Sequence, residues 1–207
     1  MIPSVPTGTL DVLLFLVGII MDETYVFIDG GYLSKISKHF GKGKYLVFDI
    51  NQFANTIAKS QGLWCKGTFY YTAPPYQSSN PTPDEKIRKS NHDKFISKMK
   101  KIPNFIVREG RCQKLDDGFH QKGVDTLLTM DLTDVTERDI KSIIVVICDT
   151  DFVPILNKIR EIGIEVILFY FSDFKRDSKF SMSNHLFTAC DKYIMIELEH
   201  FKKSIKK

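Results

Sequence analysis

The sequence lacks the clustered cysteines and histidines that build zinc sites and disulfide frameworks. Its 207 residues include four cysteines, and no two of them are close together: Cys65, Cys112, Cys148 and Cys190. No zinc-knuckle or redox CxxC spacing occurs, and the five histidines show no metal-binding spacing. This pattern fits a reducing compartment, so we expect a cytoplasmic protein without structural zinc.

Long hydrophobic runs are also missing. The apolar stretch Val12–Met21 is far shorter than the roughly 20 residues that a membrane span needs. No basic residue precedes it and no small-residue cleavage site follows, which disfavours a signal peptide. We therefore expect no membrane anchor and interpret residues 1–21 as an apolar extension outside the conserved fold. A short helix that packs on the domain or on a partner is the alternative.

Internal repeats and low-complexity segments are absent, and the length suits one α/β domain, at residues 22–200. The net charge of +4 permits nucleic-acid binding without requiring it. Lysines and arginines crowd residues 84–101 and the basic tail 201–207. These basic segments are expected to be either solvated surfaces or surfaces that follow phosphates.

Apolar strands alternate with amphipathic helices along the domain. Strands are expected at Tyr25–Ile28, Gly67–Tyr71, Phe105–Val107, Ile143–Cys148, Glu165–Phe171 and Tyr193–Ile196. Helices are expected at Tyr32–Phe40, Ile50–Lys59, Asp84–Lys101, Val124–Leu132, Asp151–Glu161 and Asn184–Ala189. Residues 108–121 are expected to be irregular. The alternation predicts an α/β fold, a three-layer α/β/α sandwich with a mostly parallel central sheet.

Acidic residues follow two of these strands. Asp149 and Asp151 come after one buried strand, Asp29 comes after the first strand, and Asp125 lies in the first turn of a helix that begins near the same edge. Ligands bind at the carboxyl ends of strands in open α/β sheets. Carboxylates alone can hold Mg²⁺, and such an ion can activate water for attack on a phosphodiester. Simpler interpretations are a helix cap for Asp151, a helix-dipole interaction for Asp125 and an Asx turn for Asp29.

Four motifs resemble those of one family. In chain order they are Val26–Leu33, Gln121–Leu132, Val145–Pro154 and Ala189–Tyr193. They are similar to the opening, central, third and closing motifs of the NYN domain, the LabA-like branch of the PIN-like nuclease superfamily. The resemblance covers about residues 24–197. It implies a PIN-like (Rossmann-like) fold and a Mg²⁺- or Mn²⁺-dependent ribonuclease that hydrolyses RNA with metal-activated water. RNA and a second copy of the chain, in a homodimer, are the implied partners.

By this resemblance, Asp29, Asp125, Asp149 and Asp151 match the catalytic and metal-binding acids. Asp131 matches a further acid of the family, but it lies six residues after Asp125 and therefore well round the helix. We expect it to make a supporting or structural contact.

Three departures from the family pattern concern the metal site. The fourth acid that many PIN nucleases place after the second strand is not evident, and Asp84 and Glu85 are the nearest candidates. Tyr32 stands where many relatives carry Asn, and it is a second candidate for a supporting contact. Cys148 stands where Gly is common. Either of these last two differences bears on metal affinity or on the approach of substrate.

Candidate RNA-binding residues flank the acids, and they are Arg108, Arg111, Lys114 and Lys122. Tyr70, Tyr71 and Tyr76 are candidates for base stacking if they are exposed.

Two other functions compete with the nuclease. A catalytically weak PIN-like module that binds RNA or protein is the main alternative. A haloacid-dehalogenase-like phosphatase shares the strand-Asp-x-Asp pattern, but its motif is expected near the N-terminus and followed by Gly-Thr.

Overall fold

Six parallel strands form the centre of the protein. The computed structural model describes residues 21–116, 118–173, 175, 178, 180 and 182–205. The strands lie in the order β3-β2-β1-β6-β7-β8, and every neighbouring pair is parallel. Their bounds are Glu23–Asp29 (β1), Trp64–Thr72 (β2), Phe105–Glu109 (β3), Ser142–Val146 (β6), Glu165–Tyr170 (β7) and Lys192–Met195 (β8). The predicted mostly parallel sheet is confirmed.

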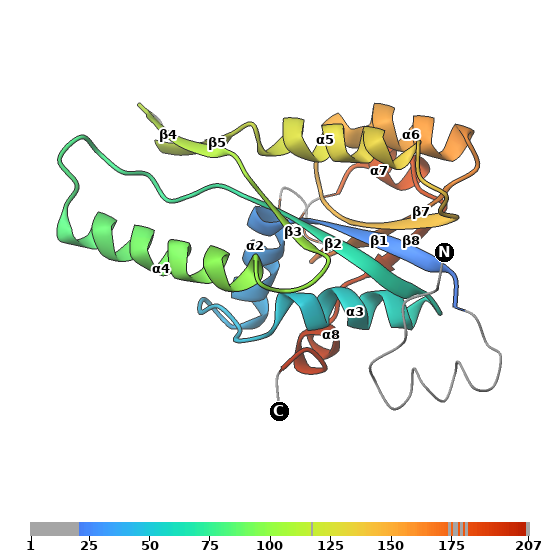
Figure 1. Cartoon of the computed structure of the whole chain (residues 1–207), viewed down its shortest axis with the longest axis horizontal. Coiled ribbons are helices and arrows are strands. Elements are labelled where there is room, and N and C mark those ends of the chain that lie inside the picture. Colours follow the sequence, from blue (N-terminus) through green and yellow to red (C-terminus); the bar gives the residue numbers. More distant parts are fainter. Residues whose placement is uncertain are drawn as a thin grey trace.

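Helices cover both faces of this sheet, so the predicted three layers are confirmed (Figure 1). One face carries α2 (Gly30–Phe40), α3 (Ile50–Ser60), α4 (Pro83–Met99) and α8 (Leu198–Lys202). The other face carries α5 (Val124–Val135), α6 (Val153–Glu161) and α7 (Asn184–Thr188), with the short 3₁₀ helix η1 (Thr150–Phe152) before α6.

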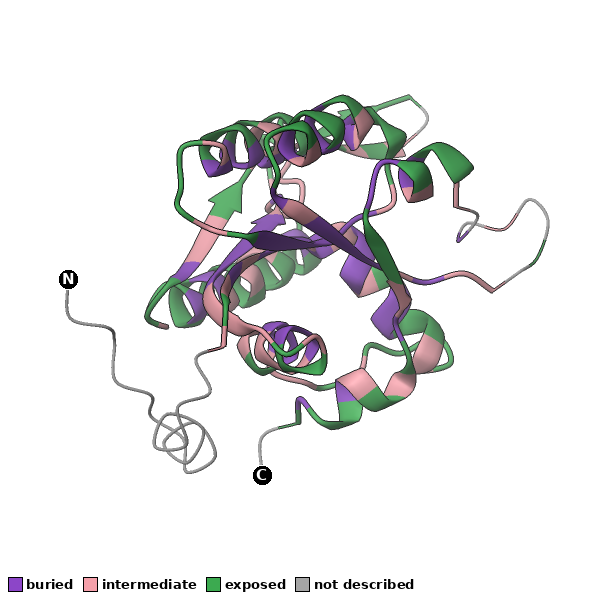
Figure 2. Cartoon of the chain, turned by 90° about the vertical axis from the view of Figure 1, so that its right-hand side faces the viewer, coloured by how far each residue is buried: buried purple, intermediate pink, exposed green. Residues whose placement is uncertain are grey.

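Alternating side chains of the strands fill the two hydrophobic cores. In β1, Val26 and Ile28 join the core under α2 and α3, whereas Phe27 joins the core under α5 and α6. This follows from the two-residue period of a strand. Figure 2 shows the resulting buried sheet between exposed helical surfaces. Parallel strands place all their carboxyl ends at one edge, which is the edge that carries the acids.

A hairpin replaces the irregular segment expected at residues 108–121. Strands β4 (Arg111–Leu115) and β5 (Gly118–Lys122) pair antiparallel and form a separate two-stranded sheet. Most of their side chains are exposed. The expectation was wrong because a hairpin that is polar on both faces shows no apolar alternation.

The C-terminal helix packs on the domain. Helix α8 crosses residue 200, where we placed the end of the domain, and its Phe201 is only 1% exposed. The Asp49 amide also donates to the Ser204 carbonyl over 2.9 Å. The apolar extension lies outside the described residues, except for Met21. Among the helices that the structure describes, none has the length and apolar character to cross a bilayer.

A buried polar network ties α5 to the sheet. Asp131 of α5 is 4% exposed, and its Oδ2 accepts from the Tyr71 hydroxyl over 2.8 Å. The Arg108 guanidinium donates to both carboxylate oxygens, over 2.9 Å and 2.6 Å. This ion pair raises the pKa of Arg108. Asp131 therefore links β2, β3 and α5.

We predict that Asp131→Ala lowers the free energy of unfolding by about 2–3 kcal/mol, because the buried Tyr71 hydroxyl loses its acceptor. Asp134→Ala, at an exposed position of the same helix, should change it by less than about 0.5 kcal/mol. Urea denaturation followed by circular dichroism measures both. Equal stability of the two variants would contradict this role.

Candidate metal and nuclease site

Asp29 ends β1 and caps α2. Its Oδ1 accepts hydrogen bonds from the Gly31 and Tyr32 amides, over 2.8 Å and 3.1 Å. Burial raises the pKa of the Asp29 carboxyl, and these two amides partly offset that effect. The charge of Asp125 raises the pKa further, whereas Lys35 lowers it. Both hydrogen bonds are accepted by Oδ1 rather than by Oδ2.

Asp149 and Asp151 lie three and five residues beyond the end of β6. The Asp149 Oδ1 accepts from the Asp151 amide over 3.0 Å, so Asp149 caps η1. The cap that the sequence suggested for Asp151 is therefore made by Asp149. The side chain of Asp151 remains exposed in the first turn of η1.

Asp125 adds an acid from a third chain segment to the edge of the sheet that carries Asp29 and Asp149. It lies in the first turn of α5, after Gly123, whose φ of 80° is a conformation that glycine adopts without strain. Burial raises the pKa of Asp125, and the charges of Asp149 and Asp151 raise it further. Together with the effect of Asp125 on Asp29, these interactions join the four aspartates electrostatically. We call Asp29, Asp125, Asp149 and Asp151 the acid cluster.

The thiol of Cys148 lies in the same negatively charged environment. Burial raises the pKa of its thiol to about 11, and the charges of Asp29, Asp149 and Asp125 contribute to the increase. The charge of Lys35 acts in the opposite direction and lowers this pKa.

Direct metal ligation is incomplete in this arrangement. Within the described part of the chain, no three His, Cys, Asp or Glu side chains are arranged so that they could hold an ion by themselves. Mg²⁺ commonly uses one or two carboxylates and completes its shell with water and substrate phosphates. The acid cluster suits this binding mode, since its donors are all carboxylate oxygens.

The other predicted site residues lie around the cluster in different roles. Asp131 and Arg108 belong to the buried network described above. The Tyr32 hydroxyl accepts from the Phe171 amide over 2.8 Å, so it holds the chain just after β7. Tyr70 and Tyr71 are 5% and 0% exposed, which removes them as stacking surfaces.

The basic hairpin residues are exposed, but they do not share one face. Arg111 and Lys122 are paired across the two strands, whereas Lys114 is paired with Phe119. Strand pairing therefore places Lys114 on the opposite face of the hairpin from Arg111 and Lys122. Tyr76 packs against Phe119, with ring centroids 5.4 Å apart.

Two residues beside the acids were not singled out from the sequence. Lys35 lies one helical turn after Gly31 and acts on Asp29. The Gln121 side chain lies next to Gly31, where an added Cβ would come within 3.6 Å of its Oε1. Helical spacing from Gly31 could have revealed Lys35, but Gln121 depends on the hairpin fold.

The fold is similar to that of a solved protein. A protein of unknown function from Vibrio parahaemolyticus RIMD 2210633 (VPA0982) aligns with a TM-score of 0.54 and 17% identity. The alignment covers 87% of this chain and 96% of that chain. At this identity the similarity shows the fold alone. A search of the curated proteins gives no match.

The family model for the NYN domain matches residues 23–197. The matched range begins at β1 and includes all four members of the acid cluster. It also extends beyond β8. The chain therefore belongs to the NYN domain family, which is part of the PIN-like superfamily of nucleases.

Proposed function

We propose that this protein is a Mg²⁺- or Mn²⁺-dependent ribonuclease that hydrolyses RNA phosphodiester bonds at the acid cluster. Membership of the NYN family indicates a nuclease-type, RNA-related function. The observation that carries the finer proposal is the convergence of four aspartates from three chain segments, with raised pKa values at Asp29 and Asp125. The negative charges of these carboxylates repel one another in the protein alone, and a bound divalent cation relieves this repulsion.

Asp29, Asp125, Asp149 and Asp151 are the residues that would hold the ion. A bound Mg²⁺ or Mn²⁺ supplies a nucleophile at neutral pH and neutralises charge that develops on the phosphate. The protein fixes two of its carboxylates before any ligand binds. Asp29 is oriented by two amides of α2, and Asp149 is oriented by the Asp151 amide. Such fixed orientation lowers the cost of reaching the reactive geometry.

Basic side chains around the acid cluster would contact the phosphates of the RNA. Lys35 lies close enough to influence Asp29, and Arg111 and Lys122 extend from the neighbouring hairpin. Phosphate contacts of this kind position a nucleic acid without reading its sequence. They also compensate for the repulsion between the acid cluster and an RNA backbone. The proposed enzyme therefore combines an acidic centre with basic flanks.

A catalytically weak module that binds RNA or a protein partner is the alternative. One observation favours it, namely that among the described residues no three potential ligands are already arranged around an ion. Retention of all four acids favours the nuclease, because a binding module gains nothing from their repulsion.

We predict that Asp149→Asn lowers metal-dependent RNA cleavage by at least about 100-fold, because a ligand is lost while the side-chain shape is kept. The assay uses single-stranded and hairpin RNAs with Mn²⁺, Mg²⁺ or EDTA. Asp134→Asn, an exposed change near the end of α5, is the matched control and should retain activity. Cleavage that persists in EDTA or in Asp149→Asn would contradict the proposal. RNA binding without cleavage would favour the alternative.

The stability of the metal-free protein should depend on the protonation of Asp125. The pKa of the Asp125 carboxyl is raised in the folded protein, so the folded protein binds a proton at this carboxyl more tightly than the unfolded chain does. The protonated carboxyl therefore contributes to the stability of the fold. This contribution is complete below the ordinary pKa of about 3.9 and is lost as the pH rises through the raised pKa of the folded protein. In EDTA, Asp125→Asn should therefore melt at a higher temperature than the wild type at pH 7, and the difference should shrink as the pH falls towards 4.

Thermal denaturation by circular dichroism measures this difference, with Asp134→Asn as the control. A lower melting temperature of Asp125→Asn at pH 7 would show that the carboxylate stabilises the metal-free fold, contrary to the argument from repulsion.

A further inference from the structure

A basic groove begins where α2 meets the acid cluster. A hollow of about 490 Å³ extends from Gly30 and Gly31 past Lys35 and Lys38 to Tyr45. Among the described residues that line it, two are lysines and none is acidic. We call this hollow the α2 groove. Its charge is opposite to that of the acid cluster and complementary to a phosphate backbone.

The lysines of the α2 groove follow one face of the helix. Lys35 and Lys38 come four and seven residues after Gly31, which is the spacing of neighbours along a helical face. Lys35 is the one closer to the acids, since its charge acts on both Asp29 and Cys148. A strand with one phosphate at the acids can therefore place following phosphates near Lys35 and then near Lys38.

An exposed aromatic ring stands at the far end of the α2 groove. Tyr45 is 66% exposed, and the Lys38 Nζ lies 5.8 Å from its ring centroid. A ring beside cations is the usual arrangement for stacking one base of a single strand. Tyr70 and Tyr71 are buried, so they do not offer this surface.

Two further hollows lead from Tyr45 towards the lysines of α4. Tyr45 and Ser34 also line a second hollow of about 640 Å³, which extends to Lys98 of α4. Lys98 in turn borders a third hollow of about 690 Å³ along α4, with further lysines at Lys86, Lys89, Lys94 and Lys101. The first two hollows share Ser34 and Tyr45, and the last two share Lys98, so the three adjoin one another from the acid cluster to α4. The middle hollow is mainly apolar and includes Asp49, and the third includes Asp93, which pairs with Lys89.

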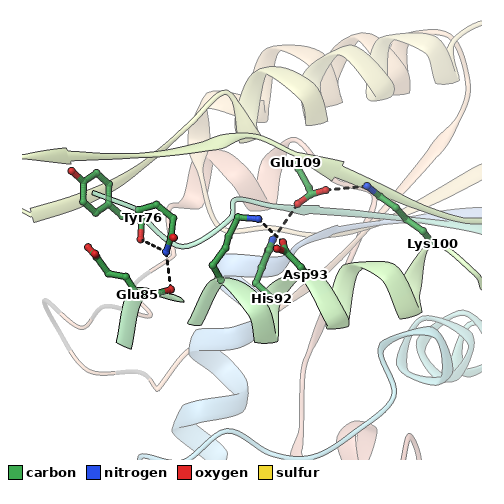
Figure 3. A network of polar contacts seen from close by, with 8 residues as sticks. Tyr76, Glu85, His92, Asp93, Lys100 and Glu109 are labelled. Carbon is green, nitrogen blue, oxygen red and sulfur yellow. Dashed lines mark hydrogen bonds and ion pairs between the residues drawn. The ribbon is translucent and has the colours of Figure 1, made fainter. Parts of the chain in front are cut away.

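Helix α4 is held firmly enough to present these lysines. Glu109 of β3 contacts His92 of α4 and Lys100, the residue directly after α4, with oxygen–nitrogen distances of 3.1 Å and 3.0 Å (Figure 3). A capping box between Thr82 and Glu85 fixes the start of the helix. The lysine face of α4 is therefore oriented by polar contacts on its other side and at its end.

We propose that the α2 groove binds single-stranded RNA next to the bond that is cut. Lys35 and Lys38 contact its phosphates, Tyr45 stacks on an unpaired base, and the α4 lysines hold the strand beyond. This inference rests on the proposed ribonuclease function for the position of the reacting bond. Bases within a duplex are stacked on one another, so Tyr45 selects for single strands.

Binding of a fluorescein-labelled oligouridine, measured by anisotropy in EDTA, tests the groove. All proteins carry Asp149→Asn, so that cleavage does not interfere. Tyr45→Ala should weaken binding about tenfold, and Tyr45→Phe should restore it. In Lys35→Ala/Lys38→Ala, the slope of log affinity against log salt should become shallower by about 0.7 for each lysine. Affinity for an RNA duplex should be unaffected by Tyr45→Ala.

The controls are Tyr193→Ala, at another exposed tyrosine on β8, and Lys158→Ala, in the last turn of α6. Both should bind oligouridine like the parent. Unchanged affinity and salt slope in the groove variants, or no binding of oligouridine by the parent, would overturn the inference.

Cleavage by the protein with Asp149 intact is measured separately. If cleavage depends on metal but the groove variants bind RNA like the parent, RNA binding in the α2 groove is rejected and the ribonuclease function is retained. Groove-dependent binding without cleavage in any metal would reject the ribonuclease and support the groove.

Discussion

Repulsion among the carboxylates of the acid cluster is the constraint on which the rest of the site depends. Adjacent parallel strands β1 and β6 bring Asp29 and Asp149 to one edge, and α5 adds Asp125. The fold compensates with local hydrogen bonds, since amides at the starts of α2 and η1 hold two of the acids. These bonds orient the carboxylates but do not cancel their charges. The remaining repulsion provides a driving force for binding a divalent cation.

Basic surfaces complete this arrangement on two sides. The hairpin presents Arg111 and Lys122, and α2 presents Lys35 and Lys38. An RNA backbone would be repelled by four aspartates alone, so its approach requires cations at the rim. Asp131 shows how an acid of similar sequence context can have another role. It lies round the helix from Asp125, and its charge is compensated inside the fold by Arg108.

Sequence patterns predicted the six strands of the central sheet and the helices α2 to α7 that cover it, because apolar periodicity directly reflects burial. Helix α8 was not predicted. They also predicted Asp29, Asp125 and Asp149 as candidates, since strand ends and helix starts are local features. The hairpin was not predicted, because its exposed faces carry no apolar alternation. The burial of both Tyr70 and Tyr71 could not be predicted from the sequence either, because it arises from the position of β2 between β1 and β3 with helices on both faces. Contacts between distant segments, such as Gln121 beside Gly31, require the tertiary structure.

The most direct measurement is the melting temperature as a function of Mn²⁺ concentration, for the wild type and for Asp149→Asn. If the acid cluster binds the ion in the folded state alone, a concentration 100-fold above the dissociation constant adds about 2.7 kcal/mol of stability. For a domain of this size, the melting temperature of the wild type should then rise by about 5–10 °C. Asp149→Asn should show a much smaller rise. A wild-type melting temperature that does not respond to Mn²⁺, or equal shifts in both proteins, would contradict the account.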